Sequence, residues 1–321
     1  MTVPVVTGYV VWAAALRRHP AGERWAGAAA RVLGQLAMLG AATPLAVLLF
    51  WIAAIPAGRA FALPLVGLFV HAFGGAAAWA LGRVAGADRP TQGVYFLAGA
   101  SSNVLTFGGI VVVLLLRSPA DPHAERALAE MALYRIFEAP FYFLCAWPLA
   151  AALGTSEKGR FFRRGFRPVT LVPLLAIALG WALNVAGVRR PAAFEGMSEH
   201  LVKVNVTLMG LCVGLTLRRA SPRKHLGAGL RMSLVKFVLV PLVSALLAAA
   251  LGFRGVTLQV VAVCAAMPVA FLAVIASNLL ALDQELTGSL WLLTTLGMLA
   301  VVPLLALGIP LLAQGGVPGH P

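Results

Sequence analysis

Long apolar runs alternate along the chain with short segments that carry the charges. A membrane-spanning helix needs about 20 mostly apolar residues, and the shorter runs reach this length if flanking charges extend to the membrane surface. The runs lack the alternation of apolar and polar residues that is typical of transmembrane strands. The charge-free runs are 1–16, 32–58, 60–82, 90–116, 139–156, 168–188, 204–217, 237–253, 255–282 and 286–321. This pattern predicts an all-α polytopic membrane protein with ten transmembrane helices.

The composition agrees with this interpretation. Hydrophobic residues make up 60% of the 321 residues and charged residues only 11%, which is more apolar surface than a soluble domain can bury. The first run has no basic region ahead of it and is followed by Arg17 and Arg18, so we expect a helix rather than a signal peptide. The three cysteines are far apart and lack metal-ligand spacing. We therefore expect no metal site, no cofactor and no disulfide.

The formal net charge of +14 follows from an uneven distribution of basic residues between the loops. Most of the 25 Lys and Arg residues lie in the odd-numbered loops. The positive-inside rule places those loops in the cytoplasm and both termini outside. The charge thus indicates membrane topology rather than a nucleic-acid partner, and we expect a multi-pass protein of the plasma or bacterial inner membrane.

A basic loop near the middle of the chain, "GTSEKGRFFRRGFRP" (154–168), separates five predicted helices from five. Because five is odd, the second half enters the membrane with inverted orientation, as in inverted-repeat transporters. We expect a first repeat at 1–155, a linker at 156–168 and a second repeat at 169–321.

The fourth predicted helix of each half contains features that interrupt helices. An offset of 165 residues between the halves places Asn103 opposite Pro268 and His71 opposite Lys236. Small polar residues and two glycines occupy the centre of the first of these helices, "GASSNVLTFGG" (99–109), whereas a proline interrupts the second. Broken helices at matching positions indicate a transporter binding site, because freed backbone groups must line a cavity or be buried in protein.

Such a site favours an anion, since the N-termini of half-helices carry partial positive charge and the Asn103 amide can donate to a carboxylate. The alternative is a proline kink beside a packing patch of small residues. The expected substrate-binding residues are Ser101, Ser102, Asn103, Thr106, Met267 and Pro268. The expected helix-breaking residues are Gly108, Gly109 and Pro268.

Two other ionisable groups are candidates for proton coupling. Glu138, three residues after Arg135, is expected near mid-membrane, where carboxylates are costly and often functional. The alternative is a local ion pair between the two. His71 lies deep in an apolar run and is either a proton relay or a hydrogen-bonded packing residue.

Several segments resemble the auxin efflux carrier family of membrane transport proteins. "AAMPVAFLAVIASNLLALDQELTGSLWLLTTLGMLAVVPLL" (265–305) is similar to the family's last two helices, and "LAGASSNVLTFGGI" (97–110) to its fourth, although Ile110 replaces the family's proline. "ATPLAVLLF" (42–50) and "VKFVLVPLV" (235–243) resemble its second and eighth helices. The resemblance implies two inverted five-helix repeats with crossing helices 4 and 9, and transport of organic anions such as dicarboxylates and auxin.

The sequence therefore favours a secondary transporter, or permease, of a small organic anion that works by alternating access. A sodium-coupled symporter of the bile-acid-symporter type and a non-transporting receptor remain alternatives. ATP drive is disfavoured because no phosphate-binding loop is present. An enzyme is disfavoured because "GASSN" lacks the last glycine of Gly-x-Ser-Gly and no His-Glu-x-x-His occurs. The expected partners are the anion and the lipid bilayer, with monomer and homodimer both open.

Overall fold

The computed structural model describes residues 22–52, 61–116, 123–154, 168–194, 197–216, 220–280 and 282–314. Throughout these ranges the regular structure is helical, without a strand. The all-α prediction is therefore confirmed for this part of the chain. The first predicted helix (1–16) and nearly all of the predicted linker (156–168) lie outside the described residues.

Several predicted spans consist of helical segments joined by wider π-helical turns or by non-helical residues. The first half contains α2 (Gly22–Gln35), η1 (Leu36–Ala42), α3 (Thr43–Ile52), α4 (Ala62–Val84), α5 (Arg89–Ala100), η3 (Val104–Gly108), α6 (Gly109–Leu116), α7 (His123–Tyr134), α8 (Glu138–Phe141), η4 (Tyr142–Ala146) and α9 (Trp147–Gly154). The second half contains α11 (Pro168–Val185), η5 (Ala192–Phe194), α12 (Met197–Thr216), α13 (Leu226–Leu234), η7 (Val235–Leu239), α14 (Val240–Ala250), α15 (Gly255–Ala265), α16 (Phe271–Leu279) and α17 (Gln284–Gln314).

Among the described residues, five helical segments are long and apolar enough to cross a membrane. They are Ala28–Leu48, Ala62–Val84, Glu130–Leu153, Leu226–Ala250 and Gln284–Ile309. Predicted spans 90–116 and 255–282 are each divided into shorter helices. The chain is thus a multi-pass membrane protein, whereas the arrangement as ten helices in two inverted repeats remains a prediction.

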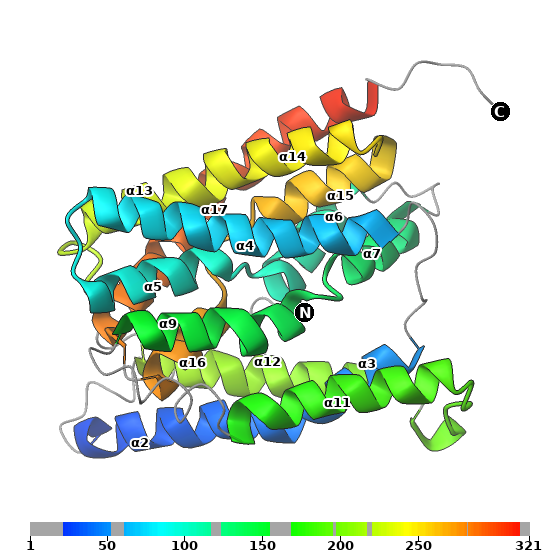
Figure 1. The fold of residues 1–321 in the computed structure, drawn as a ribbon, viewed down its shortest axis with the longest axis horizontal. Helices are drawn as coiled ribbons and strands as arrows, with labels where there is room; N and C mark the ends of the chain where they lie inside the picture. The colour runs from blue at the N-terminus through cyan, green and yellow to red at the C-terminus, as the bar shows by residue number, and fades with distance from the viewer. Residues whose placement is uncertain are drawn as a thin grey trace.

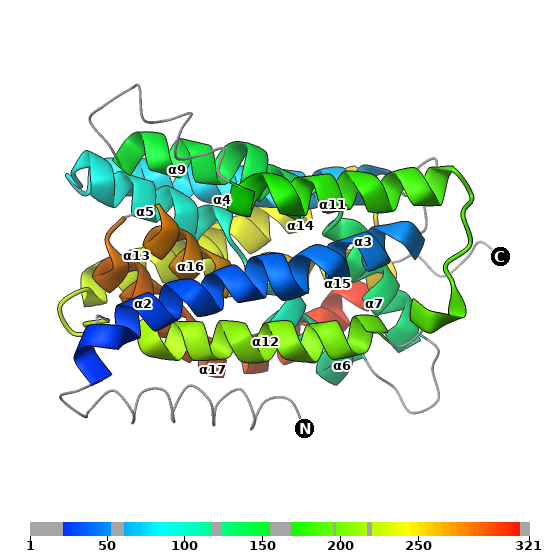
Figure 2. The same cartoon turned by 90° about the horizontal axis from the view of Figure 1, so that it is seen from below.

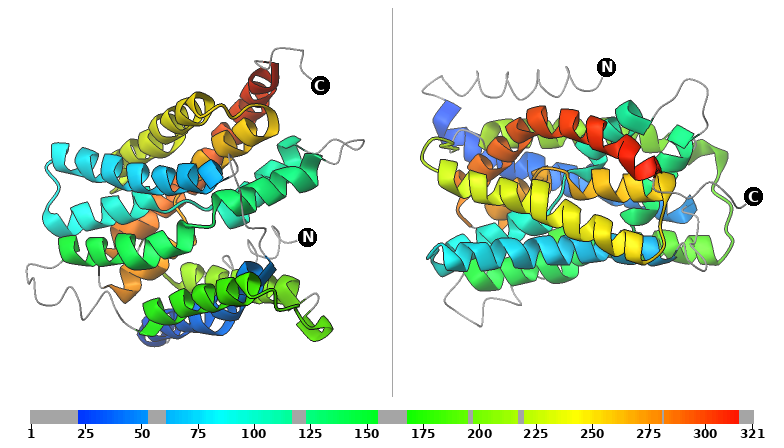
Figure 3. Two further views of the ribbon diagram at one scale, coloured as in Figure 1. Left: turned by 45° about the vertical axis from the view of Figure 1, so that its right-hand side comes forward. Right: turned by 90° about the horizontal axis from the view of Figure 1, so that it is seen from above.

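The helices form two groups, which we call the panel and the bundle. The panel comprises α2, η1, α3, α11 and α12, and the bundle comprises the other described helices apart from the short η5. In Figure 2 the rod formed by α2 and α3 runs between α11 and α12. Figure 3 shows the panel lying along one side of the bundle. The two groups meet at an apolar cluster of Ala30, Cys212 and Leu215 from the panel and Ile275 from α16.

Side-chain to backbone hydrogen bonds hold the panel together at one end. The Asn184 side chain donates to the Phe50 carbonyl at 3.0 Å, and the Trp51 indole donates to the Val188 carbonyl at 2.7 Å. Further along, Gly180 allows α11 to approach the Val47 carbonyl, which an added Cβ would meet at 2.6 Å. These contacts join α3 to α11 independently of the bundle.

Three of the π-helical turns have a common cause in the sequence, because each is followed after one residue by a proline. Pro44, Pro148 and Pro241 have no N–H to donate, and their rings clash with the carbonyl four residues earlier. The helix widens there, and the residue before each proline bonds to the carbonyl five residues back, as Val240 does to Val235. Such π-bulges are frequent at functional sites.

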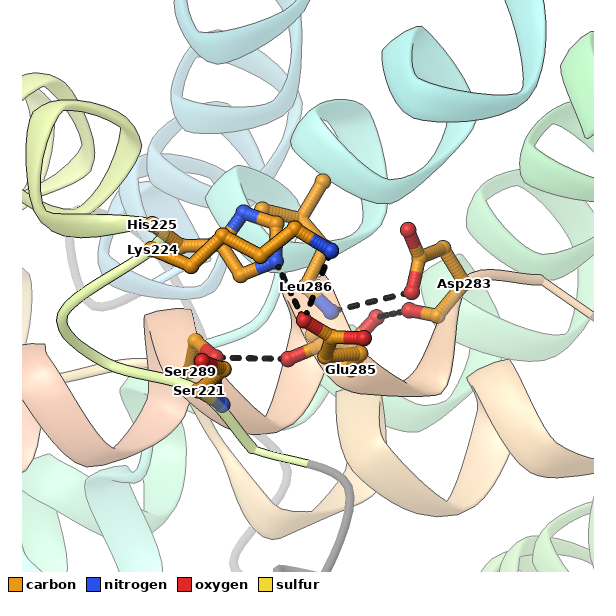
Figure 4. A network of polar contacts seen from close by, with 8 residues as sticks. Ser221, Lys224, His225, Asp283, Glu285, Leu286 and Ser289 are labelled. Carbon is orange, nitrogen blue, oxygen red and sulfur yellow. Dashed lines mark hydrogen bonds and ion pairs between the residues drawn. The ribbon is translucent and has the colours of Figure 1, made fainter.

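Polar contacts join two neighbouring loops at one end of the bundle (Figure 4). The Glu285 carboxylate accepts from Lys224 at 3.0 Å and lies 3.2 Å from the His225 ring nitrogen. The Ser289 hydroxyl accepts from the Ser221 N–H at 2.9 Å. Figure 1 places the starts of α13 and α17 at the same end as the turn between α4 and α5, with the turn between α14 and α15 at the other. The odd-numbered predicted loops before α5, α13 and α17 thus lie at the same end of the bundle.

Glycines let α4 and α5 pack backbone against backbone. A Cβ added to Gly74 would lie 2.6 Å from the Gly99 carbonyl oxygen, and one added to Gly99 would overlap the Gly74 carbonyl and the Ala78 side chain. Both glycines are buried. Close helix approach through small residues is typical of membrane bundles, and here it fixes the C-terminal end of α5 against α4.

We expect Gly99→Ala to lower the unfolding free energy by about 1–3 kcal/mol, since the new methyl group overpacks a backbone contact. The midpoint of thermal unfolding in detergent measures the loss. Gly227→Ala is the matched control, because nothing lies within 4 Å of its added Cβ. Equal midpoints for the two variants would contradict the proposed close contact.

Candidate functional site

The first broken helix comprises α5, η3 and α6, and its interruption lies at Ser101–Asn103. Ser101 is extended, with φ −102° and ψ 130°, and Asn103 precedes the π-helical turn η3. Gly108 and Gly109, expected to break the helix, instead lie in η3 and at the start of α6. The interruption therefore lies at the small polar residues of the predicted stretch 99–109 and not at its two glycines. Thr106 also lies within η3.

The second broken helix comprises α15 and α16, and residues 266–270 separate them. Pro268 lies in the middle of this interruption. The following residue, Val269, donates its N–H to the Thr294 hydroxyl of α17 at 3.2 Å, and that hydroxyl donates to the Leu290 carbonyl. The last helix thus supplies a partner for a backbone group that the interruption frees.

The two interruptions meet directly. The Asn103 N–H donates to the Pro268 carbonyl at 2.9 Å. Next to this bond the buried Met267 side chain packs on Gly108, where an added Cβ would lie 3.3 Å from Met267 Cγ. The sequence offset of 165 paired Asn103 with Pro268, and the structure places these two residues in contact. We call this region the crossing.

A buried lysine binds the C-terminal end of α5 at the crossing. Lys236, in the π-helical turn η7, is fully buried. Its Nζ donates to the Gly99 carbonyl at 3.2 Å, the Ser101 carbonyl at 2.8 Å and the Ser102 hydroxyl at 2.6 Å. Carbonyls at a helix C-terminus carry partial negative charge, so the amine lies where a cation is favoured.

His71 and Tyr142 complete the hydrogen bonding around the same interruption. His71 Nδ1 lies 2.9 Å from the Ala100 carbonyl, so this nitrogen carries the proton and donates. The Tyr142 hydroxyl accepts from the Ser102 N–H at 3.1 Å and lies 3.3 Å from His71 Nδ1. Because an unpaired backbone group is costly in lipid, these partners allow the helix to be interrupted.

Glu138 forms the local ion pair that the sequence offered as one of two interpretations. The carboxylate accepts from Arg135, which lies in the turn between α7 and α8. Glu138 is nevertheless buried.

The Asn103 side chain carries a buried donor at the crossing. Its residue is 5% exposed, and among the described residues its Nδ2 has no hydrogen-bond partner. A buried donor without an acceptor costs about 1–3 kcal/mol. η3 and α16 begin directly after the two interruptions, and their N-terminal ends bring partial positive charge to this region. An anion with a free oxygen would satisfy the amide here.

The structure thus brings together most of the residues that the sequence singled out. Ser101, Ser102 and Asn103 meet Met267 and Pro268 at the crossing. The sequence paired Lys236 with His71 by the offset of 165 but predicted no role for it, and it gave no indication of Tyr142 or Thr294. The pairing was a usable signal for the lysine. Nothing comparable marks the tyrosine or the threonine among the many hydroxyl residues.

The second half of the chain matches a known family. Residues 161–306 match the family model described as membrane transport protein, the family of the auxin efflux carriers. The resemblance seen in segments 235–243 and 265–305 is therefore confirmed, whereas segments 42–50 and 97–110 lie outside the matched residues. A search of curated proteins finds no match to the chain.

We expect Tyr142→Phe to destabilise the protein by about 1–3 kcal/mol, since the buried Ser102 N–H loses its acceptor. Tyr134→Phe is the matched control, because that buried hydroxyl has no partner among the described residues. Thermal unfolding of the two variants measures the difference. A Tyr134→Phe variant that lost as much stability as Tyr142→Phe would contradict the role of the hydroxyl at the interruption.

Proposed function

We propose that this chain, whose residues 161–306 match the membrane transport protein family, is a secondary transporter of a small organic anion. The observation that carries the proposal is Asn103 Nδ2, which has no hydrogen-bond partner among the described residues and lies where two interrupted helices touch. In broken-helix transporters the substrate lies at such a crossing near the middle of the membrane. The anion is a carboxylate in this proposal, because a carboxylate oxygen accepts well from an amide N–H.

The charges around the crossing support an anionic substrate. Lys236 contributes a buried basic group within hydrogen-bond distance of Ser101 and Ser102. The N-termini of η3 and α16 contribute the positive ends of two half-helices. A substrate carboxylate near Asn103 would interact favourably with all three. Ser101, Ser102, Thr106, Met267 and Pro268 form the remainder of the proposed substrate-binding set.

Alternating access by two inverted five-helix repeats is the proposed mechanism. Residues 62–154 and 226–314 share one order of elements: a long helix, an interrupted helix and a further helical segment. Transporters built in this way rock or gate one group of helices against another around a fixed site. The panel and the bundle are the natural candidates for these two groups, since they meet at an apolar cluster around Ile275 and at Met38, which packs in the core of the bundle. The repeats are taken as 1–155 and 169–321.

The proposed topology places the protein in the plasma or inner membrane with both termini outside and the odd loops in the cytoplasm. Two of those loops are joined by the ion pair between Lys224 and Glu285. The basic residues there fit the positive-inside rule. The crossing forms within one chain, so the proposal holds for a monomer and for a homodimer.

We expect purified protein in sealed proteoliposomes to take up at least one of three radiolabelled acids: malonate, malate or an auxin-like aromatic acid. Asn103→Ala should reduce kcat/KM roughly 10- to 100-fold, because a hydrogen bond to a charged group contributes about 1.5–3 kcal/mol. Asn184→Ala is the control, since that amide bonds within the panel.

Wild-type uptake that Asn103→Ala left unchanged would contradict the site. Binding of an acid without uptake would favour the receptor alternative. Neither binding nor uptake of any of the three acids by folded protein would contradict the proposed substrate class.

Proton coupling through Glu138 is the proposed drive, with His71 as the second candidate. An imposed pH gradient should stimulate uptake by the wild-type protein, and Glu138→Gln should abolish that stimulation because the amide cannot exchange a proton. Glu285→Gln is the control, since this carboxylate pairs with Lys224 at the end of the bundle. The same stimulation in Glu138→Gln as in the wild type would place the proton carrier elsewhere.

A further inference from the structure

The oxygen atoms around Lys236 resemble the ligands of a bound metal cation, but the group they surround is a side chain of the protein itself. All three acceptors of its Nζ come from residues 99–102, the last residues of α5 and the start of the interruption. Two of them are backbone carbonyls and the third is the Ser102 hydroxyl. The residue itself is fully buried, so these oxygens take the place of the water that would otherwise surround the group.

The geometry of these contacts fits the ammonium form of Lys236. An ammonium ion has three N–H donors, one for each of the two carbonyls and the Ser102 hydroxyl at 3.2, 2.8 and 2.6 Å. A neutral amine would donate to the two carbonyls and accept from the Ser102 hydroxyl. The charged form is therefore part of the proposal, and the comparison of a charged with a neutral rescuing molecule tests it.

Carbonyls of an interrupted helix are the ligands that sodium-coupled transporters offer to their coupling ion. Here the lysine reaches those carbonyls from η7, the π-helical turn placed by Pro241. We propose that the Lys236 ammonium is a resident cation that occupies the position of a coupling metal ion at the crossing. The chain then keeps its positive charge beside the substrate site without binding sodium.

Charged and titratable side chains from the neighbouring elements surround this cation. His71 comes from α4 and Tyr142 from η4, and both bond to the interruption that Lys236 holds. Glu138, from α8, is buried and pairs with Arg135. The three oxygens of residues 99–102 therefore remain the partners of the lysine.

The site itself does not depend on the proposed transport, and only the sodium independence of uptake rests on that proposal. The test is thermal unfolding of purified protein at one ionic strength in sodium, propylammonium or N-methylglucamine chloride. Four proteins are compared: the wild type, Lys236→Ala, Lys236→Met and Lys224→Ala. Lys224→Ala is the matched control, since this exposed lysine bonds to Glu285 at the end of the bundle.

The wild type and Lys224→Ala should unfold at the same midpoint in all three salts. Lys236→Ala should unfold several degrees lower in N-methylglucamine and recover part of that loss in propylammonium, which fits the vacated space and supplies the charge. Neutral propanol should give no recovery. Lys236→Met fills the space without a charge, so it should be destabilised and unresponsive to either cation.

A sodium-dependent rise in the wild-type midpoint would overturn the proposal, because the metal position would then be vacant in the natural protein. A Lys236→Met variant as stable as the wild type would also overturn it. Equal recovery of Lys236→Ala by propanol and by propylammonium would do the same. If Lys236→Ala cannot be purified, the wild-type sodium titration and Lys236→Met still decide the question. Failure of the transport assays leaves these readouts unaffected.

Discussion

The interruption of the first broken helix depends on the capture of its freed backbone groups by other helices. An unpaired carbonyl or N–H costs several kcal/mol in lipid, so a helix can be interrupted there only if partners replace its internal hydrogen bonds. Lys236, His71, Tyr142 and Pro268 provide those partners from four different elements. The same contacts fix the positions of these elements relative to one another, so the fold and the site have a common origin.

Proline chemistry explains how two of these partners reach the interruption. Pro241 and Pro148 each follow a π-helical turn by one residue, and Lys236 and Tyr142 lie in those turns. Pro268 acts differently, since it lies in a segment that has left the helix altogether. Pro268 therefore helps to form an interruption at the crossing, whereas Pro241 and Pro148 shape the helices that contact it.

Much of this arrangement could be predicted from the sequence. The charge-free runs indicated membrane helices because burial in lipid requires long apolar segments, and Pro268 marked an interruption because proline cannot donate a backbone hydrogen bond. The position of the other interruption could not be derived in the same way. Ser101–Asn103 contains no proline or glycine, and its backbone leaves the helix where partners distant in sequence bind it.

The most direct test of the crossing as the substrate site is a structure of the protein in lipid nanodiscs with a transported carboxylate bound at saturating concentration. We predict that a carboxylate oxygen lies within hydrogen-bond distance of Asn103 Nδ2, with Lys236 still bound to the Ser101 carbonyl and the Ser102 hydroxyl. A carboxylate bound elsewhere, with the crossing unchanged and the Asn103 amide still without a partner, would contradict that assignment.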